Sequence, residues 1–221
     1  MVCEGQKKLV FNSKKITALQ KIELDRNTGI KISSHKMEWS ALNENFEMNE
    51  YGKFNSYAYL HLLHFKYIEK TGKTIVFAQE FSSYKHSYID DGYLLEIDSE
   101  MKLIQTLNLP KIGRTLFDFS SDGFGLEATR AFDFLYSQEL PNKEGTVFCY
   151  VANERPNKTE KKKPEYVFGI ITYIDGKFNH QKISLKTSES TIVPIKAKRG
   201  YFILRETSKK DTELRLEKIN Y

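Results

Sequence analysis

The stretch Gly92 to Leu109, GYLLEIDSEMKLIQTLNL, decides the fold of this chain. Two apolar runs flank the polar residues 98–101 (DSEM), a pattern that predicts two antiparallel strands joined by a short turn. Three other stretches repeat it, the last in truncated form: ITALQKIELDRNTGIKISSHKMEW (16–39), FGIITYIDGKFNHQKISL (168–185) and ELRLEKINY (213–221). We therefore expect a chain built from recurring antiparallel β units.

Glycines mark the turns between several of these strands. Gly29 follows Arg26-Asn27-Thr28, and Asp175-Gly176 is one of the strongest short hairpin signals, because glycine accepts a positive φ. The segments 40–55 and 82–91 are polar and are expected to be loops, and 110–127 is expected to be irregular. A long strand is expected over 57–68, and a shorter one over 131–136.

A second pattern identifies the central strands. A glycine precedes an apolar run that ends in glutamate in GKTIVFAQE (72–80), GTVFCYVANE (145–154) and GYFILRE (200–206). The first two runs are apolar on both faces, which is typical of strands covered by two layers. We predict that 74–81, 146–153 and 201–206 are the inner strands of successive meanders, with Phe77 and Phe148 buried.

These patterns predict an all-β fold of antiparallel four-stranded meander repeats. Such repeats are typical of β-propeller blades, so we expect a β-propeller-like chain of about three and a half blades, forming a partial or minimal ring. A single β-repeat domain is expected over 1–221, with approximate repeats at 7–39, 57–109, 131–185 and 191–221. The alternative is an open β-sandwich or a meander that does not close.

Composition excludes several classes of protein. The 34 basic and 29 acidic residues, net charge +5, are interspersed, so we expect a solvated surface and no nucleic-acid partner. The densest basic run, 158–163, lies in a loop (155–165) that we expect to be mobile, exposed and dispensable for folding. Cys3 and Cys149 form neither a disulfide framework nor a zinc motif, and the redox compartment stays open.

The sequence contains no run of apolar residues long enough for a transmembrane segment, and its start, MVCEGQKKLVF, lacks the apolar centre of a signal peptide. As given, the chain is expected to stay in the cytoplasm. A periplasmic or secreted location is expected if it is a fragment of a longer exported protein.

The most specific similarity lies in FGIITYIDGKFNHQKISL, STIVPIKAKRGYFILRET and ELRLEKINY, which resemble the C-terminal part of an uncharacterised Bacteroidetes family of secreted, β-propeller-like proteins of unknown function. TIVFAQEF followed by GYLLEIDSEMKLI is similar to an earlier part of the same family. The resemblance implies repeats and export over about residues 60–221. It carries over no functional residue.

Two groups of residues are candidates for a binding site. Glu80, Glu154 and Glu206 end three equivalent strands and would share one rim of a ring, unless each carboxylate only accepts hydrogen bonds from a turn or pairs with a basic residue. Tyr84, His86 and Asp91 belong to an aromatic and acidic loop that suits a glycan or protein ligand. His61 and His64 are three apart, so in a regular strand they face opposite sides and cannot share a metal.

We therefore expect a non-catalytic binding or scaffold module with no cofactor, no metal and no catalytic residue. The alternative is a glycan-directed hydrolase, which needs two carboxylates roughly 5–10 Å apart in a central cleft. The last repeat has three strands, so the edge near 214–219 is expected to be open. We predict that 7–11 (KKLVF) covers this edge or that the chain self-associates through the C-terminal edge strand.

Overall fold

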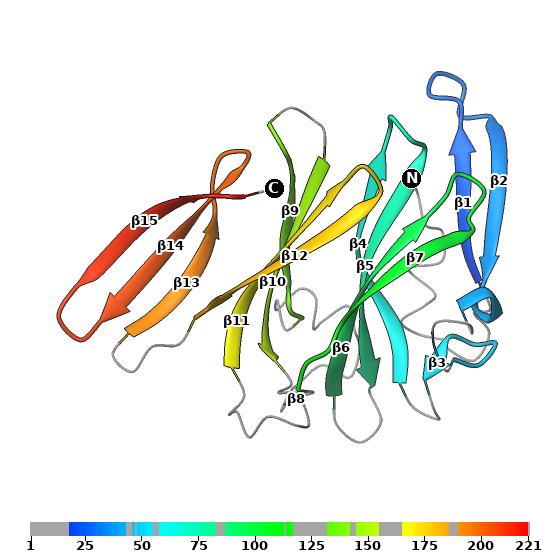
Figure 1. Ribbon diagram of the computed structural model, residues 1–221. Helices are drawn as coiled ribbons and strands as arrows, with labels where there is room; N and C mark the ends of the chain where they lie inside the picture. Colours follow the sequence, from blue (N-terminus) through cyan, green and yellow to red (C-terminus); the bar gives the residue numbers. More distant parts are fainter. Residues whose placement is uncertain are drawn as a thin grey trace. The chain divides into compact units, whose positions relative to one another are not determined.

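A computed structural model describes residues 18–42, 46, 48–54, 58–82, 87–112, 114–116, 132–141, 145–154, 165–185 and 190–220 (Figure 1). These residues form antiparallel strands and one short 3-10 helix, with no α-helix among them. The chain divides into two compact units: unit 1 comprises 1–109 and 113–132, and unit 2 comprises 110–112 and 133–221. The all-β, antiparallel class is thus confirmed, whereas the single repeat domain stays a prediction.

Unit 1 contains two sheets. The smaller one pairs β1 (Ala18–Leu24) with β2 (Lys31–Glu38), which runs into the 3-10 helix η2 (Trp39–Leu42). The larger one is a meander to which β8 adds by pairing with the start of β6. Its strands are β3 (Lys53–Phe54), β4 (Ala58–Ile68), β5 (Lys73–Ser82), β6 (Ser87–Ile97), β7 (Leu103–Leu109) and β8 (Arg114–Leu116).

The core of unit 1 lies between one face of the larger sheet and the residues around β1, β2 and η2. Leu60, Val76 and Leu95 come from the sheet, and Met37 and Trp39 come from the other side. The opposite face of β5 is buried as well, with Phe77 at 1% exposure. This double burial explains why residues 75–78 of β5 (IVFA) are apolar without alternation.

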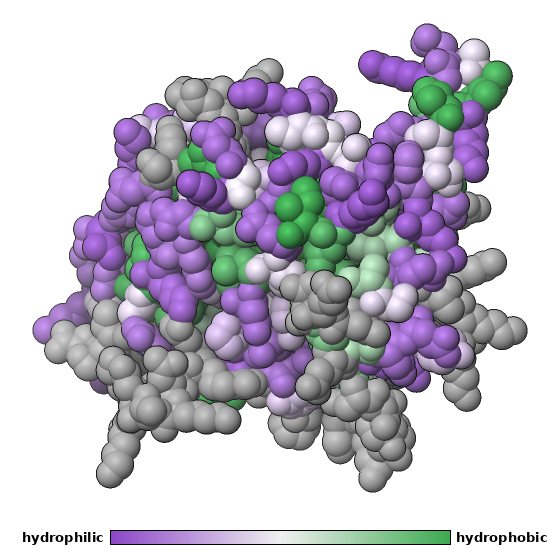
Figure 2. All heavy atoms as spheres, turned by 45° about the vertical axis from the view of Figure 1, so that its right-hand side comes forward, coloured by the Kyte–Doolittle hydropathy of each residue, from purple (hydrophilic) through white to green (hydrophobic). Residues whose placement is uncertain are grey.

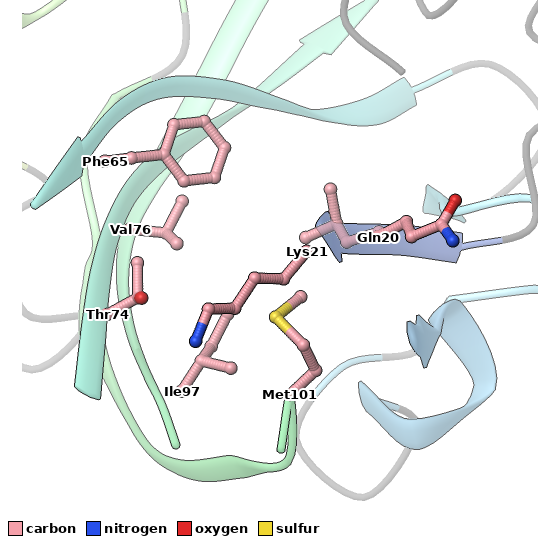
Figure 3. A pocket seen from close by; sticks show the side chains of 8 residues that line it. Gln20, Lys21, Phe65, Thr74, Val76, Ile97 and Met101 are labelled. Carbon is pink, nitrogen blue, oxygen red and sulfur yellow. The ribbon is translucent and has the colours of Figure 1, made fainter. Parts of the chain in front are cut away.

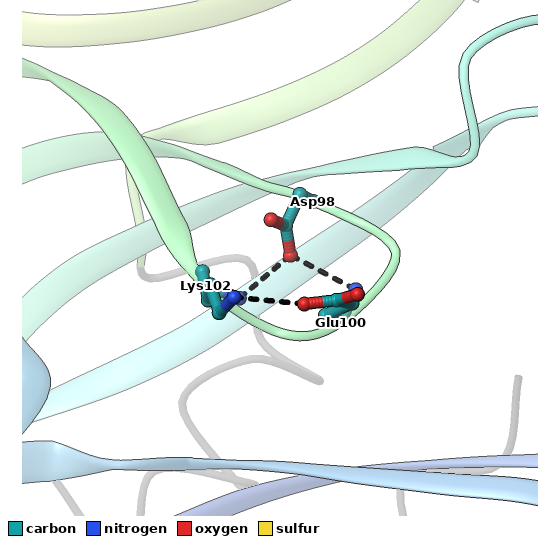
Figure 4. A network of polar contacts seen from close by, with 3 residues as sticks. All are labelled: Asp98, Glu100 and Lys102. Carbon is teal, nitrogen blue, oxygen red and sulfur yellow. Dashed lines mark hydrogen bonds and ion pairs between the residues drawn. The ribbon is translucent and has the colours of Figure 1, made fainter.

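The turn of the fold-deciding hairpin is built around Asp98 (Figure 4). Its Oδ1 accepts hydrogen bonds from the backbone N–H groups of Glu100 and Lys102, at 2.9 and 2.8 Å. Lys102 Nζ contacts Glu100 Oε2 at 2.8 Å, and this ion pair raises the pKa of Lys102. Met101 has a φ of 69°, an unfavourable value for its side chain, which is nonetheless buried in the unit 1 core.

Unit 2 consists of two antiparallel meanders. The first is the four-stranded sheet of β9 (Phe134–Glu139), β10 (Gly145–Glu154), β11 (Glu165–Ile174) and β12 (Lys177–Ser184). The second is the three-stranded sheet of β13 (Ser190–Lys196), β14 (Tyr201–Ser208) and β15 (Thr212–Lys218). One hydrophobic core joins them, with Cys149 and Phe168 from the first sheet and Phe202 and Leu204 from the second.

The central strands of three meanders match the prediction from sequence. β5 lies between β4 and β6, β10 between β9 and β11, and β14 between β13 and β15. Phe77 and Phe148 are both buried, at 1% and 0% exposure. The Asp175-Gly176 hairpin is confirmed too, since both residues have positive φ, at 48° and 77°, as a type I′ turn requires.

Several details of the sequence analysis were wrong. The expected loop 40–55 contains most of η2 and all of β3, and the stretch 110–127, expected to be irregular, contains β8. The expected loop 82–91 is half strand: β6 begins at Ser87, and Ile89 is fully buried beside Phe81. The strand expected at 131–136 is β9, which lies at 134–139; Gln138 within it and Leu140 just after it are buried. A further error concerns the two histidines of β4.

The register of β4 shifts between Leu62 and His64, which marks a β-bulge at Leu63. His61 lies opposite Gln79 and His64 lies opposite Phe77, two residues on the same face of β5. The bulge therefore puts both histidines on one face, against the prediction of opposite faces. Residues 7–11, expected to cover the edge near 214–219, and residues 155–164 of the expected mobile loop lie outside the described residues.

Candidate functional site

The residues expected to form a binding site are held by different strands. Glu80 lies near the end of β5, beside an irregularity in its pairing with β6, and Asp91 lies within β6. Both side chains are half-buried, and neither is without an interaction partner. Tyr84 and His86 lie outside the described residues, so the aromatic and acidic loop stays a prediction.

Glu206 has a clear local role in the β13–β14–β15 sheet. Its Oε2 lies 3.3 Å from Nη2 of Arg215, and Ser190 Oγ donates a hydrogen bond to Oε1. These contacts link all three strands of the sheet and fit the structural interpretation of this carboxylate. Glu154 is the last residue of β10 and pairs in register with Glu165. The shared acidic rim of Glu80, Glu154 and Glu206 stays a prediction.

Buried ionisable groups are paired within each unit. Glu96, fully buried in unit 1, contacts Lys73 Nζ at 2.6 Å and accepts a hydrogen bond from Gln105 Nε2. In unit 2 Lys111 forms an ion pair with Asp133, and both side chains are more than nine-tenths buried. Because burying a charge without a partner is strongly unfavourable, removing one member of either pair would destabilise the fold. Both carboxylates therefore have a structural role.

A small cavity lies in unit 1 between β1 and the larger sheet (Figure 3). Apolar side chains line most of it, and Lys21 extends into it from β1. Lys21 Nζ lies 2.6 Å from Glu23 Oε1 and 5.5 Å from the centre of the Tyr67 ring. The cavity volume of about 10 Å³ holds about one water molecule, which is too small for a substrate.

Cys149 is the thiol of the described chain, and its surroundings make it unreactive. It lies in β10, fully buried in the unit 2 core. Burial raises its pKa to about 12, and the hydrogen bond with Tyr136 and the nearby charge of Lys196 offset only part of that effect. Burial also raises the pKa of the neighbouring Tyr136 hydroxyl. A nucleophilic cysteine needs the opposite shift, so Cys149 is a packing residue.

Histidines and carboxylates do not gather into a metal centre in the parts of the chain that the structure describes. His61, although it shares a face with His64, stacks on Phe132 with ring centres 4.7 Å apart and meets the edge of Phe81. His180 instead forms a 2.8 Å hydrogen bond with the Tyr150 hydroxyl. Both rings are thus part of aromatic packing.

Sequence reasoning missed an apolar surface at the tip of the β1–β2 hairpin. Leu24, Ile30 and Ile32 are 51%, 67% and 66% exposed, and hydrophobic side chains gather at the end of a projecting hairpin in Figure 2. Asp25 organises the turn, because its Oδ1 accepts hydrogen bonds from the N–H groups of Asn27 and Thr28. These hydrogen bonds lower the pKa of Asp25, and the one from the Thr28 N–H has the largest effect. We call Leu24, Ile30 and Ile32 the hairpin tip.

The hairpin tip could have been found from one signal in the sequence. Apolar residues flank the polar turn DRNTG directly on both sides, at Leu24 and Ile30, where solvated turns usually carry polar neighbours. Exposed aliphatic side chains next to each other are typical of surfaces that bind another molecule.

Comparison with known proteins gives a match for the C-terminal half of the chain. Residues 115–220 match a family of unknown function (DUF6770). No curated protein and no solved structure was found to match the chain. Among the described residues, no helix has the length and apolar character needed to span a membrane. The family match covers β9 to β15 and so includes both meanders of unit 2, and it assigns them no activity.

Proposed function

We propose that this chain is a non-catalytic binding or scaffold module whose binding surface includes the hairpin tip. The observation that carries the proposal is the exposure of Leu24, Ile30 and Ile32 beside a turn whose backbone is hydrogen-bonded to Asp25. An apolar projection that is already ordered by internal hydrogen bonds loses less conformational entropy when it enters a groove, which favours binding.

The chemistry of the tip favours a protein partner over a glycan. Its three aliphatic side chains supply apolar contact area and no hydrogen bonds for sugar hydroxyls. Arg26 and Lys31 stand beside them and are exposed. The partner that fits is therefore a protein with an apolar groove and acidic residues at its rim.

The propeller-like arrangement is part of the same proposal. Its support is the pair of meanders whose central strands, β5 and β10, are buried on both faces, as blades of a stacked repeat would be. Export by a bacterium rests on the family resemblance alone. In the described residues no observation favours the glycan-directed hydrolase, since the best-defined candidate carboxylate, Glu206, is engaged by Arg215 and Ser190.

Photo-crosslinking tests the proposed surface. Ile30 is replaced by p-benzoylphenylalanine, and the chain is irradiated in an extract of its source cells. The matched control carries the same group at Lys36, an exposed residue of the same hairpin but farther from the tip. We expect a discrete cross-linked product from position 30 only, and mass spectrometry identifies the partner.

A competition experiment tests specificity. Excess unlabelled wild-type chain is expected to remove the product, whereas the triple variant Leu24→Ser, Ile30→Ser, Ile32→Ser is expected not to compete. Circular dichroism checks that the triple variant folds, which its exposed positions favour. Equal products from positions 30 and 36, or full competition by the triple variant, would refute the hairpin tip as a binding surface.

A further inference from the structure

The outer edge of β15 is open in the described structure. β15 pairs with β14 and with no other described strand (Figure 1). Every residue of β15 except Arg215 and Glu217 is exposed, with Leu214 at 64% and Leu216 at 56%. An open edge with exposed leucines is a template for another strand.

Hydrogen bonds at the two ends of β15 fix which backbone groups face outward. Ser208 N–H donates to Asp211 O at one end, and Ile219 N–H donates to Gly200 O at the other. In an antiparallel pair such residues alternate, so 211, 213, 215, 217 and 219 direct their backbone groups to β14. Thr212, Leu214, Leu216 and Lys218 therefore direct their N–H and C=O groups away from β14.

The side chains of these outward residues lie on an exposed apolar face of the sheet. The cross-strand partners form two rows, Val193–Arg205–Leu214 and Ile195–Ile203–Leu216. Val193 and Ile195 are exposed, as are both leucines. The opposite face, with Ile192, Phe202 and Leu204, is buried in the unit 2 core. A strand added to β15 would extend the apolar rows and cover the sides of the leucines.

We propose that two copies of this chain associate through antiparallel pairing of their β15 strands, with Leu216 opposite Leu216 of the second copy. The charges along β15 favour a second copy as the partner strand, and they favour this register. Arg215 of each copy then lies opposite Glu217 of the other, twice in the symmetric pair, and Leu214 lies opposite Lys218. Arg215 has donors to spare, because its guanidinium has five and one nitrogen contacts Glu206.

Neighbouring registers place like charges opposite each other. Pairing centred on Arg215 puts two arginines together and sets Glu213 against Glu217 twice. Pairing centred on Leu214 places Glu213 opposite Arg215, which is favourable, but it also places Asp211 opposite Glu217. Like charges directly opposite are destabilising, so the register centred on Leu216 is favoured.

The test is size-exclusion chromatography with light scattering of the full chain over a wide range of concentrations. We expect a concentration-dependent dimer. Glu217→Lys faces Arg215 of the second copy and is expected to raise the dissociation constant roughly tenfold. Glu213→Lys is the matched control, because it makes the same change in the same strand but faces no charge in this register.

Mixing two variants gives an independent readout of the register. Arg215→Glu alone is expected to weaken the dimer, since it faces Glu217. An equimolar mixture of Arg215→Glu with Glu217→Lys restores opposite charges at both contacts and is expected to form a heterodimer near wild-type affinity. Circular dichroism checks folding, and if Arg215→Glu fails to fold, the comparison of Glu217→Lys with Glu213→Lys decides alone.

Three outcomes overturn the proposal. The first is a wild-type chain that stays monomeric at every concentration. The second is an equal loss of affinity in Glu213→Lys and Glu217→Lys, which excludes the register. The third is a monomer whose amides at 214, 216 and 218 exchange slowly, because a segment of the same chain, such as 7–11, would then occupy the edge. The proposal is independent of the binding role of the hairpin tip.

Discussion

Replacing Gly169 by alanine should disrupt the packing of Tyr150. The two residues are cross-strand neighbours in β11 and β10, and the Tyr150 ring lies directly over the glycine. A Cβ atom at position 169 would lie 2.0 Å from Cε1 and 2.1 Å from Cζ of that ring. These distances are far shorter than a van der Waals contact, so the Tyr150 ring must move away from residue 169.

The expected loss follows from what the ring contacts. Tyr150 is 5% exposed, and its hydroxyl forms the 2.8 Å hydrogen bond with His180. Overpacking in a core lowers stability by about 1–3 kcal/mol, and a lost hydrogen bond adds roughly 1 kcal/mol. Gly169→Ala is therefore expected to lower the free energy of unfolding by about 3 kcal/mol, or the melting temperature by roughly 6–12 °C.

Urea unfolding followed by circular dichroism measures this loss. Gly92→Ala is the matched control in β6, because its Cβ would meet its nearest neighbours, on Leu109, at an ordinary 3.5 Å. Its effect should stay within about 0.5 kcal/mol. In the background Tyr150→Ala, Gly169→Ala should cause no further loss, since the ring is gone. A Gly169→Ala chain as stable as the wild type, or losses that add fully in the double variant, would refute this argument.

Two further predictions concern buried ionisable groups. Because burial raises the pKa of Cys149 to about 12 from 9.0 for an exposed thiol, its contribution to stability is complete below pH 9 and is lost as the pH rises towards 12. In that window unfolding should become easier by about 1.4 kcal/mol per pH unit from this group. A thiol reagent at pH 8 should label Cys149 only after unfolding, as read by peptide mass spectrometry that separates it from Cys3; labelling of Cys149 in the native chain would contradict its buried position. Lys111→Met leaves Asp133 buried without its cation and should lower the free energy of unfolding by roughly 3–5 kcal/mol, whereas Lys111→Met with Asp133→Leu should recover most of the loss in the same urea titration.

Local signals in the sequence predict the central strands and the Asp175-Gly176 turn. Burial on both faces makes a strand apolar throughout, and positive φ selects glycine, so both leave a mark in a few consecutive residues. The bulge at Leu63 leaves no such mark, because it depends on how β4 fits β5. It reverses the face on which His64 lies, and so defeats any argument from alternation alone.

The candidate site is less predictable than the fold. The sequence places Glu206 at a strand end, but its pairing with Arg215 depends on the register of β14 and β15. The exposure of Ile30 cannot be predicted from the sequence either, since an isoleucine beside a turn can be buried by another segment or left exposed. Properties set by contacts between distant residues need the fold before they can be assigned.

Asp133 receives its cation from a segment that precedes the family match. A fragment cut at residue 115 would keep β9 to β15 but lose Lys111 and Ile112. It would remove the ion-pair partner of the Asp133 carboxylate, and it would leave the Asn153 carbonyl without the Ile112 N–H that donates to it at 2.8 Å. A fragment that begins at Pro110 keeps both contacts. Fragments of this chain should therefore be cut so that they keep the Lys111–Asp133 ion pair, rather than at the limits of the family match.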